Sequence, residues 1–216
     1  YTDWNGAMSW AAPNITVYNN ALGDFLVAGG TVTYSHDSGT SANRLLIVDV
    51  TYANQNSHTV TGVTYGGVSM AEVRPVLKAN GTANPSLHTW YLVAPAAGAN
   101  NVVVTYGAGV TGDRSAVHAA RTYYGVDQVT PYSAVTAATG LDTTSPYTGQ
   151  VTVVSASGSL VVAAHIMGGT GGSGASGDTE TERFDTYRGG LGIAIMVGQD
   201  DAGAASVEMN CTWAGA

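Results

Sequence analysis

The sequence is poor in charge, and above all in lysine. Of its 216 residues only 10% are charged, with 7 Lys and Arg against 15 Asp and Glu, and Lys78 is the only lysine. Nucleic-acid binding needs grouped Lys and Arg that neutralise phosphates, and no basic cluster occurs in this chain. The formal net charge of −8 therefore argues against a nucleic-acid partner.

Cysteine and long apolar runs are also scarce. Cys211 is alone, which excludes an intrachain disulfide framework and a cysteine-rich zinc site. No apolar run reaches the roughly 18 residues of a membrane span, so we expect none. A chain poor in lysine and rich in Thr, Ser and Gly suits an extracellular or virion surface, and we expect this protein there.

The chain has instead a hydrophobic alternation with a period of two, which predicts β-strands. With turn signals between strands and no long amphipathic helix, it predicts an all-β fold, an antiparallel β-sandwich of the jelly-roll or immunoglobulin-like kind with about 10–12 strands. A closed barrel is the alternative. Residues 113–120 would also suit a short helix, but we assign them to a strand. The alternating stretches are 25–36, 44–52, 59–65, 68–73, 87–93, 101–106, 117–126, 150–155, 159–167, 192–197 and 206–213.

Two turns have recognisable chemistry. Gly66 and Gly67 separate VTY from VSM, so they predict a two-residue hairpin loop. Asp127 ends an alternating strand and Pro131 prevents its continuation. The Asp127 carboxylate can accept N–H groups two or three residues further on, so we interpret it as a turn residue and not as a catalytic acid.

Two segments lack the regular hydrophobic alternation, and they indicate the domain organisation. Residues 1–24 show little regular alternation, and we expect them to form an N-terminal arm that packs on the sandwich or on a neighbouring subunit. Residues 25–216 are expected to form a single β-sandwich domain. Within it, residues 168–178 (GGTGGSGASGD) suit a flexible loop.

A family resemblance rests on a series of motifs in a fixed order: NRLLIVDVTY, TVTGVTYGGVSM, HTWYLVAPAAGANNVVVTY, YYGVDQVTP, ETERFD and GAASVEMNCTW. The series resembles a widespread, poorly characterised β-sandwich module of bacterial secreted proteins and phage virion structural proteins. The resemblance covers roughly residues 29–213. It implies the sandwich fold and offers no catalytic residues. Members usually continue with one more strand, so it also implies a sheet edge that another chain could complete.

Catalytic motifs are not found. The sequence has no G-x-S-x-G elbow, no H-E-x-x-H, no P-loop and no dinucleotide-binding glycine motif. Its histidines are scattered singly, and His88 and His165, which lie inside strands, are expected to be hydrogen-bonded structural residues. We therefore expect a protein that is not an enzyme and has no cofactor. The histidines are His36, His58, His88, His118 and His165.

Acidic residues offer the weak candidates for a metal site. Carboxylate oxygens are the ligands that calcium prefers, but a solvated strand face and a connecting turn explain the same residues. A glycosidase would need two such acids across a cleft, and the sequence shows no cleft. The calcium candidates are Asp178, Glu180, Asp185, Asp200 and Asp201, and Glu182 lies among them.

Aromatic residues support a binding function more strongly. Trp4 and Trp10 lie in the arm, where they could contact a partner subunit or a glycan, whereas Trp90 and Trp213 lie in strands and are expected in the core. Asn80, in the turn KANGTANP, is the best candidate among the sequons for glycosylation.

The sequence suggests three functions, which we give in order of preference. The first is a structural protein repeated on an outer surface, such as a phage capsid decoration or tail-associated protein, or an extracellular filament subunit, whose partners are its own copies or a capsid, tail or filament protein. The second is a carbohydrate-binding or adhesive module of a secreted protein. The third is a hydrolase with a carboxylate pair.

Overall fold

The computed structural model describes residues 15–27, 30–52, 60–78, 86–107, 114–133, 147–167, 174–176, 180–188 and 194–213. Their regular structure is all strand, and each paired strand runs antiparallel to its neighbour. The strands are β1 (Thr16–Val27), β2 (Gly30–Asp37), β3 (Leu45–Tyr52), β4 (Val60–Tyr65), β5 (Val68–Ser69), β6 (Ala71–Lys78), β7 (Ser86–Val93), β8 (Ala99–Tyr106), β9 (Arg114–Tyr124), β10 (Tyr147–Val153), β11 (Leu160–Met167), β12 (Gly174–Ser176), β13 (Thr181–Arg188), β14 (Ala194–Ala202) and β15 (Val207–Trp213).

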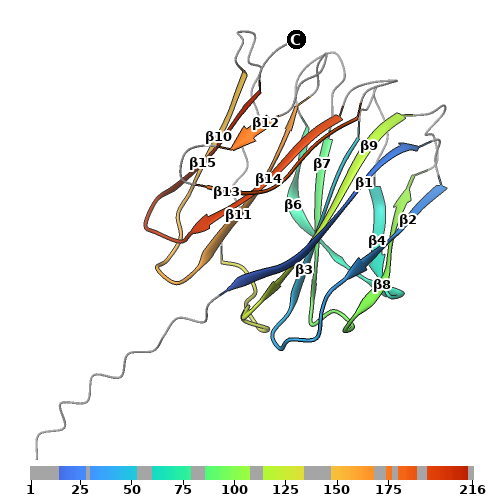
Figure 1. The fold of residues 1–216 in the computed structure, drawn as a ribbon, viewed down its shortest axis with the longest axis horizontal. Coiled ribbons are helices and arrows are strands. Elements are labelled where there is room, and N and C mark those ends of the chain that lie inside the picture. Colours follow the sequence, from blue (N-terminus) through green and yellow to red (C-terminus); the bar gives the residue numbers. More distant parts are fainter. Residues whose placement is uncertain are drawn as a thin grey trace, which may run out of the picture.

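The strands form four sheets that stack as layers (Figure 1). In stacking order we name them sheet I (β2-β8-β4-β5), sheet II (β1-β9-β3-β7-β6), sheet III (β11-β14-β13) and sheet IV (β10-β15-β12). Sheets I and II come from the N-terminal part of the chain, and sheets III and IV from the C-terminal part. The described strands of the predicted 25–216 domain thus make two facing pairs of sheets.

Sheet II is covered on both faces, and its sequence shows why. A strand buried on both sides reads as a continuous apolar run and not as an alternation, as in LLIVDVTY of β3. Leu46, Val48 and Val50 pack in the core between sheets I and II, with Val102 and Val104 of β8. The intervening residues of β3 face sheet III.

Separate cores join the remaining layers. Between sheets II and III, Phe184 of β13 packs with Val117 and Ala119 of β9, and a second cluster forms around Leu45, Tyr123 and Val126. Between sheets III and IV, Val161 of β11 packs with Val207 and Met209 of β15. The interior is therefore continuous through the stack.

The predicted fold class, an all-β antiparallel sandwich, is confirmed. The predicted strand number is too low, because fifteen strands occur in the described part alone. Short β5 and β12 and charged β13 lack a clear apolar alternation, and Asn19-Asn20 and Gly23-Asp24 interrupt the apolar residues of β1. The boundary predicted at residue 24 falls inside β1, which pairs with β9 along its length. Residues 114–120 belong to β9 and are strand, as predicted.

None of the described residues belongs to a helix with the length and apolarity needed to cross a membrane.

Candidate functional site

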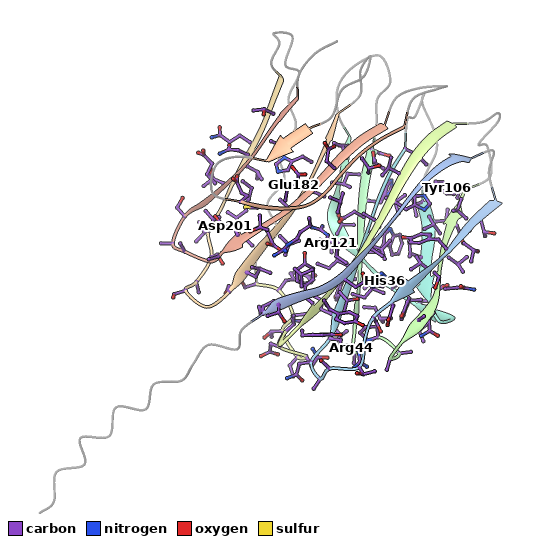
Figure 2. All side chains as sticks on the ribbon, in the orientation of Figure 1. His36, Arg44, Tyr106, Arg121, Glu182 and Asp201 are labelled. Atoms are coloured by element: carbon purple, nitrogen blue, oxygen red, sulfur yellow. The ribbon has the colours of Figure 1, made fainter. Side chains whose placement is uncertain are left out.

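The most deeply buried charges lie between sheets II and III. Arg121 of β9 and Asp49 of β3 form an ion pair in which each side chain is 1% exposed, and Figure 2 shows Arg121 between the layers. Thr89 of β7 donates a hydrogen bond to Asp49 at 2.7 Å. The guanidinium lies 5.2 Å from the ring centre of Phe184 and donates to the carbonyl oxygen of Ala163 at 3.3 Å. The pair thus ties β3 and β9 to sheet III, which is a structural use of its charge.

Sequence reasoning missed this pair. Each partner is a lone charge inside an apolar strand, LLIVDVTY and VHAARTYY. Because a buried charge needs a partner, two such strands with opposite charges could have indicated a cross-strand ion pair.

The histidines between sheets I and II are also internal. His36 Nε2 lies 2.7 Å from Thr122 Oγ1, and His118 Nε2 is hydrogen-bonded to Tyr106 Oη. Burial lowers the pKa of His36 to about 4, against a smaller opposing effect of Asp37, and lowers the pKa of His118 to about 3. Both rings are therefore neutral at physiological pH. His88, for which the sequence predicts a structural role, is also buried and is hydrogen-bonded to Glu72 at 3.0 Å, and His165, with the same prediction, is buried.

The predicted calcium candidates point to different partners. Arg183 donates to both carboxylate oxygens of Asp200, at 2.6 and 2.8 Å. Asp201 accepts the N–H of Ala202, and buried Glu180 accepts the backbone N–H of Asn210. Within the described ranges no three His, Cys, Asp or Glu side chains are grouped as a metal site would require. The calcium candidates that the structure describes therefore do not form a group of three or more.

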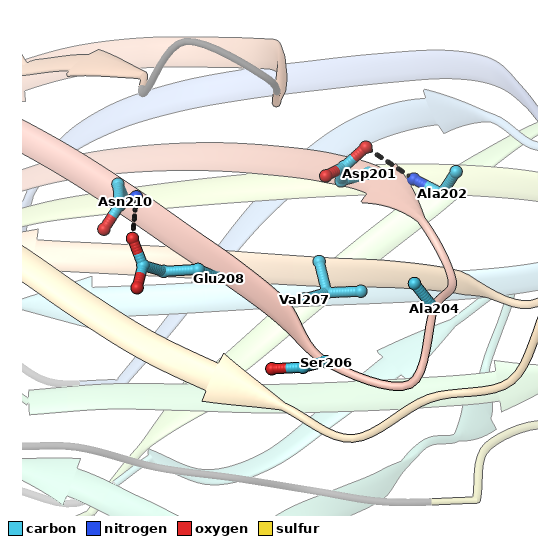
Figure 3. A pocket seen from close by; sticks show the side chains of 7 residues that line it. All are labelled: Asp201, Ala202, Ala204, Ser206, Val207, Glu208 and Asn210. Atoms are coloured by element: carbon cyan, nitrogen blue, oxygen red, sulfur yellow. Dashed lines mark hydrogen bonds between the residues drawn. The ribbon is translucent and has the colours of Figure 1, made fainter.

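A shallow hollow of about 410 Å³ opens beside β14 and β15 (Figure 3). Asn210 donates to Glu208 at 2.8 Å, and hydrogen bonds from Asn210 and Gln150 lower the pKa of Glu208. Asp201 also lines the hollow, but its bond to Ala202 holds it to its own strand. The lining residues are Asp201, Ala202, Ala204, Ser206, Val207, Glu208 and Asn210.

The turn after β9 has the arrangement expected for a turn-forming aspartate. Asp127 Oδ1 accepts the N–H groups of Val129 at 2.7 Å and Thr130 at 2.9 Å. These two bonds lower the pKa of Asp127. The turn holds Val129 and Tyr132 outward, 89% and 48% exposed, so this turn presents apolar surface to solvent.

The glycine hairpin also has the expected form. Tyr65 of β4 pairs with Val68 of β5 across Gly66 and Gly67. Their φ angles of 55° and 82° suit a type I′ turn, which demands positive φ at both central residues.

Several predicted residues lie outside the described ranges: Trp4, Trp10, Asn80 and Asp178. Trp90 is buried, as expected. Cys211 is buried as well.

The sheet edges differ in how they are protected. Natural edge strands avoid unwanted pairing by being short, charged, proline-containing or bulged. β5 and β12 are short. β6 contains Arg74 and Pro75 and has a register shift, and β13 is charged and also shifted.

The edge formed by β10 and β11 has none of these features. The two strands are consecutive in the chain and end sheets IV and III respectively. Their sequences, YTGQVTV and LVVAAHIM, contain no Asp, Glu, Lys, Arg or Pro. Their registers with β15 and β14 run without a shift. The two other edge strands each carry an acidic residue: β1 contains Asp24 and also has a register shift, and β2 ends at Asp37. Among the described edge strands, β10 and β11 are therefore the best candidates for pairing with another chain.

Comparison with protein families, with curated proteins and with solved structures finds no match to this chain.

Proposed function

We propose that this protein is a non-enzymatic structural component that is repeated on an outer surface, either of a phage virion, as a capsid decoration or tail-associated protein, or of an extracellular filament. The observation that carries the proposal is the uncharged, regular edge of β10 and β11. Such an edge presents unpaired N–H and C=O groups that favour the addition of a strand.

The internal use of polar side chains supports the same proposal. Asp49, Arg121, His36 and His118 are each buried and bonded to other parts of the fold. Groups of this kind stabilise a layered scaffold, and a repeated surface protein needs such a scaffold. The resemblance to a module of secreted and virion proteins agrees with a location outside the cell.

Sedimentation velocity of the purified chain over a wide concentration range tests the proposal. We expect a concentration-dependent shift to larger species, and electron microscopy of the native source should show the protein in a particle or a fibre. A chain that stays monomeric throughout, in a source without particles or fibres that contain it, would contradict the proposal.

A carbohydrate-binding module is the second candidate, and one described feature favours it. Tyr18 is 45% exposed and stacks on Tyr124 with ring centres 4.9 Å apart. Asp37 and Asn19 lie beside it, so an aromatic surface adjoins hydrogen-bonding groups, as sugar recognition requires. A glycan array should then give binding that the Tyr18→Ala variant loses, and an array without binding by the intact chain would remove this candidate.

A further inference from the structure

Among the described strands, sheet III is narrower than the sheet beneath it, because sheet II has five strands and sheet III has three. β13 lies near β1 and β9, and β14 near β9 and β3. The order β11-β14-β13 therefore turns the free edge of β11 toward β7 and β6, at the far side of sheet II.

The surface beside that edge is apolar and only partly covered. Tyr91 and Val93 of β7 and Val73 of β6 are half-buried, and Ala71 is exposed. Tyr132, from the turn after β9, packs edge-on against Tyr91 with ring centres 5.2 Å apart. We call these five residues the apolar strip.

The strip and the β11 edge belong to one place in the fold. Leu160 and Val162 of β11 pack against the same cluster as Tyr91 and Val93. A fourth strand of sheet III would therefore find backbone partners on β11 and an apolar floor below it. The face of such a strand that lies toward sheet II needs apolar side chains to cover the strip.

The chain contains a segment with that pattern. Residues 3–10 read DWNGAMSW, so Trp4, Met8 and Trp10 would share one face of an extended strand. The opposite face would carry Asp3, Asn5 and Ser9. This apolar face matches the apolar strip.

The position of Ile15 shows where residues 1–14 join the described fold. It directly precedes β1, which forms the edge of sheet II opposite to β6. A donor at one edge and an acceptor toward the other make a head-to-tail contact, which generates rings or filaments. Fourteen extended residues reach roughly 46 Å, which is enough to extend along a neighbouring copy.

We propose that residues 1–14 of one copy add as a strand to the β11 edge of the next copy, with Trp4, Met8 and Trp10 on the apolar strip. The inference rests on the proposed function and names its partner as a second copy of this chain.

A complementation experiment with full-length chains tests it. The donor-defective variant is Trp4→Ser with Trp10→Ser, and the acceptor-defective variant is Tyr132→Ser with Tyr91→Ser. We expect each alone to need at least a tenfold higher concentration than the wild type to assemble. An equimolar mixture should form heterodimers but no larger species, because only one functional donor and one functional acceptor are present.

Two controls keep the result interpretable. Val68→Ser changes an exposed valine on sheet I, away from the strip, and should assemble like the wild type. Thermal unfolding shows whether each variant is folded. If the acceptor-defective pair lowers the melting temperature, Tyr132→Ser alone replaces it, because that side chain is 48% exposed.

The outcomes separate the two proposals. If the wild type assembles and both variants assemble equally well, the strand-addition proposal is wrong and the proposed function stands. If the variants are monomeric but the mixture forms no complex, the arm binds elsewhere or within its own chain, and the proposal is again wrong. If the wild type itself never assembles, self-assembly and strand addition are rejected together.

Discussion

At the scale of single residues, one glycine and two tyrosines determine the turn that follows β2. Gly39 has a φ of 65°, and a Cβ built on it would lie 1.7 Å from Tyr124 Oη and 2.7 Å from a ring carbon of Tyr18. Its amide donates to Asp37. The turn thus needs a residue that adopts a positive φ and has no side chain.

Gly39→Ala should lower the free energy of unfolding more than Gly67→Ala does. Gly67 has a φ of 82° but nothing within 4 Å of its Cβ, so alanine there costs only the left-handed strain of about 1–2 kcal/mol. Gly39→Ala adds a clash to that strain, which Tyr124→Phe should partly relieve because it removes the nearest atom. Urea denaturation of the four variants, including the double variant, measures this. Equal losses at the two glycines would show that the tyrosines move away freely.

Residue patterns predicted the turns better than they predicted which buried residues contact one another. The turns at Gly66 and Asp127 depend on local backbone chemistry, which a short sequence contains. Arg121 and Asp49 are 72 positions apart, and their contact depends on how β9 and β3 pair. A single sequence predicts each strand but not the partner of its lone charge.

At the scale of strands and sheets, the Arg121–Asp49 pair holds sheet III against sheet II. Removing one partner leaves an uncompensated buried charge, which costs about 3–5 kcal/mol. Arg121→Met and Asp49→Leu should each lower the free energy of unfolding by an amount of that order. The double variant should cost less than the sum, since no charge is left unpaired. Urea denaturation of the full cycle checks this, and an additive double variant would contradict a coupled pair.

The histidines between sheets I and II make this sandwich sensitive to acid. His36 and His118 have folded-state pKa values of about 4 and about 3, below the unfolded value of about 6.5. Their neutral forms therefore stabilise the fold fully above about pH 6.5. This stability is lost as the pH falls toward the folded values, because the unfolded chain binds protons first.

The expected loss is on the order of 2 kcal/mol per histidine between about pH 7.5 and pH 5. Urea denaturation at the two pH values measures it. His118→Gln cannot titrate but keeps a hydrogen-bonding group near Tyr106, so this variant should lose less stability on acidification than the wild type. The same loss in both proteins would remove His118 from the explanation.

Alternation predicted strands well where one face is apolar, as in β4, β8 and β15. It did not extend over the whole of β13 (TERFDTYR), because the sequence interpretation covers only residues 180–183, as a solvated strand face. Phe184 of this strand nevertheless packs under Arg121, and a register shift separates it from Glu182. A shift changes which residues share a face, and a regular pattern cannot show it.

At the scale of the whole molecule, the described strands form a stack of four sheets, in which the edge strands β10 and β11 are regular and uncharged. The sequence predicted the sandwich, but not that two facing pairs of sheets would form. That division depends on sheet II being covered on both faces, by sheet I and by sheet III. The strands of sheet III come much later in the sequence than those of sheet II. The edge strands β10 and β11 are where we propose that another chain adds.

Hydrogen–deuterium exchange tests this account most directly. Amide exchange in Leu160–Met167 is compared between the chain at low concentration and the assembled protein, with β13, at the opposite edge of sheet III, as the internal reference. We predict slower exchange in β11, and in β10 if both sheets are extended, with no change in β13. Unchanged exchange in β10 and β11 on assembly, or slowing confined to other strands, would contradict it.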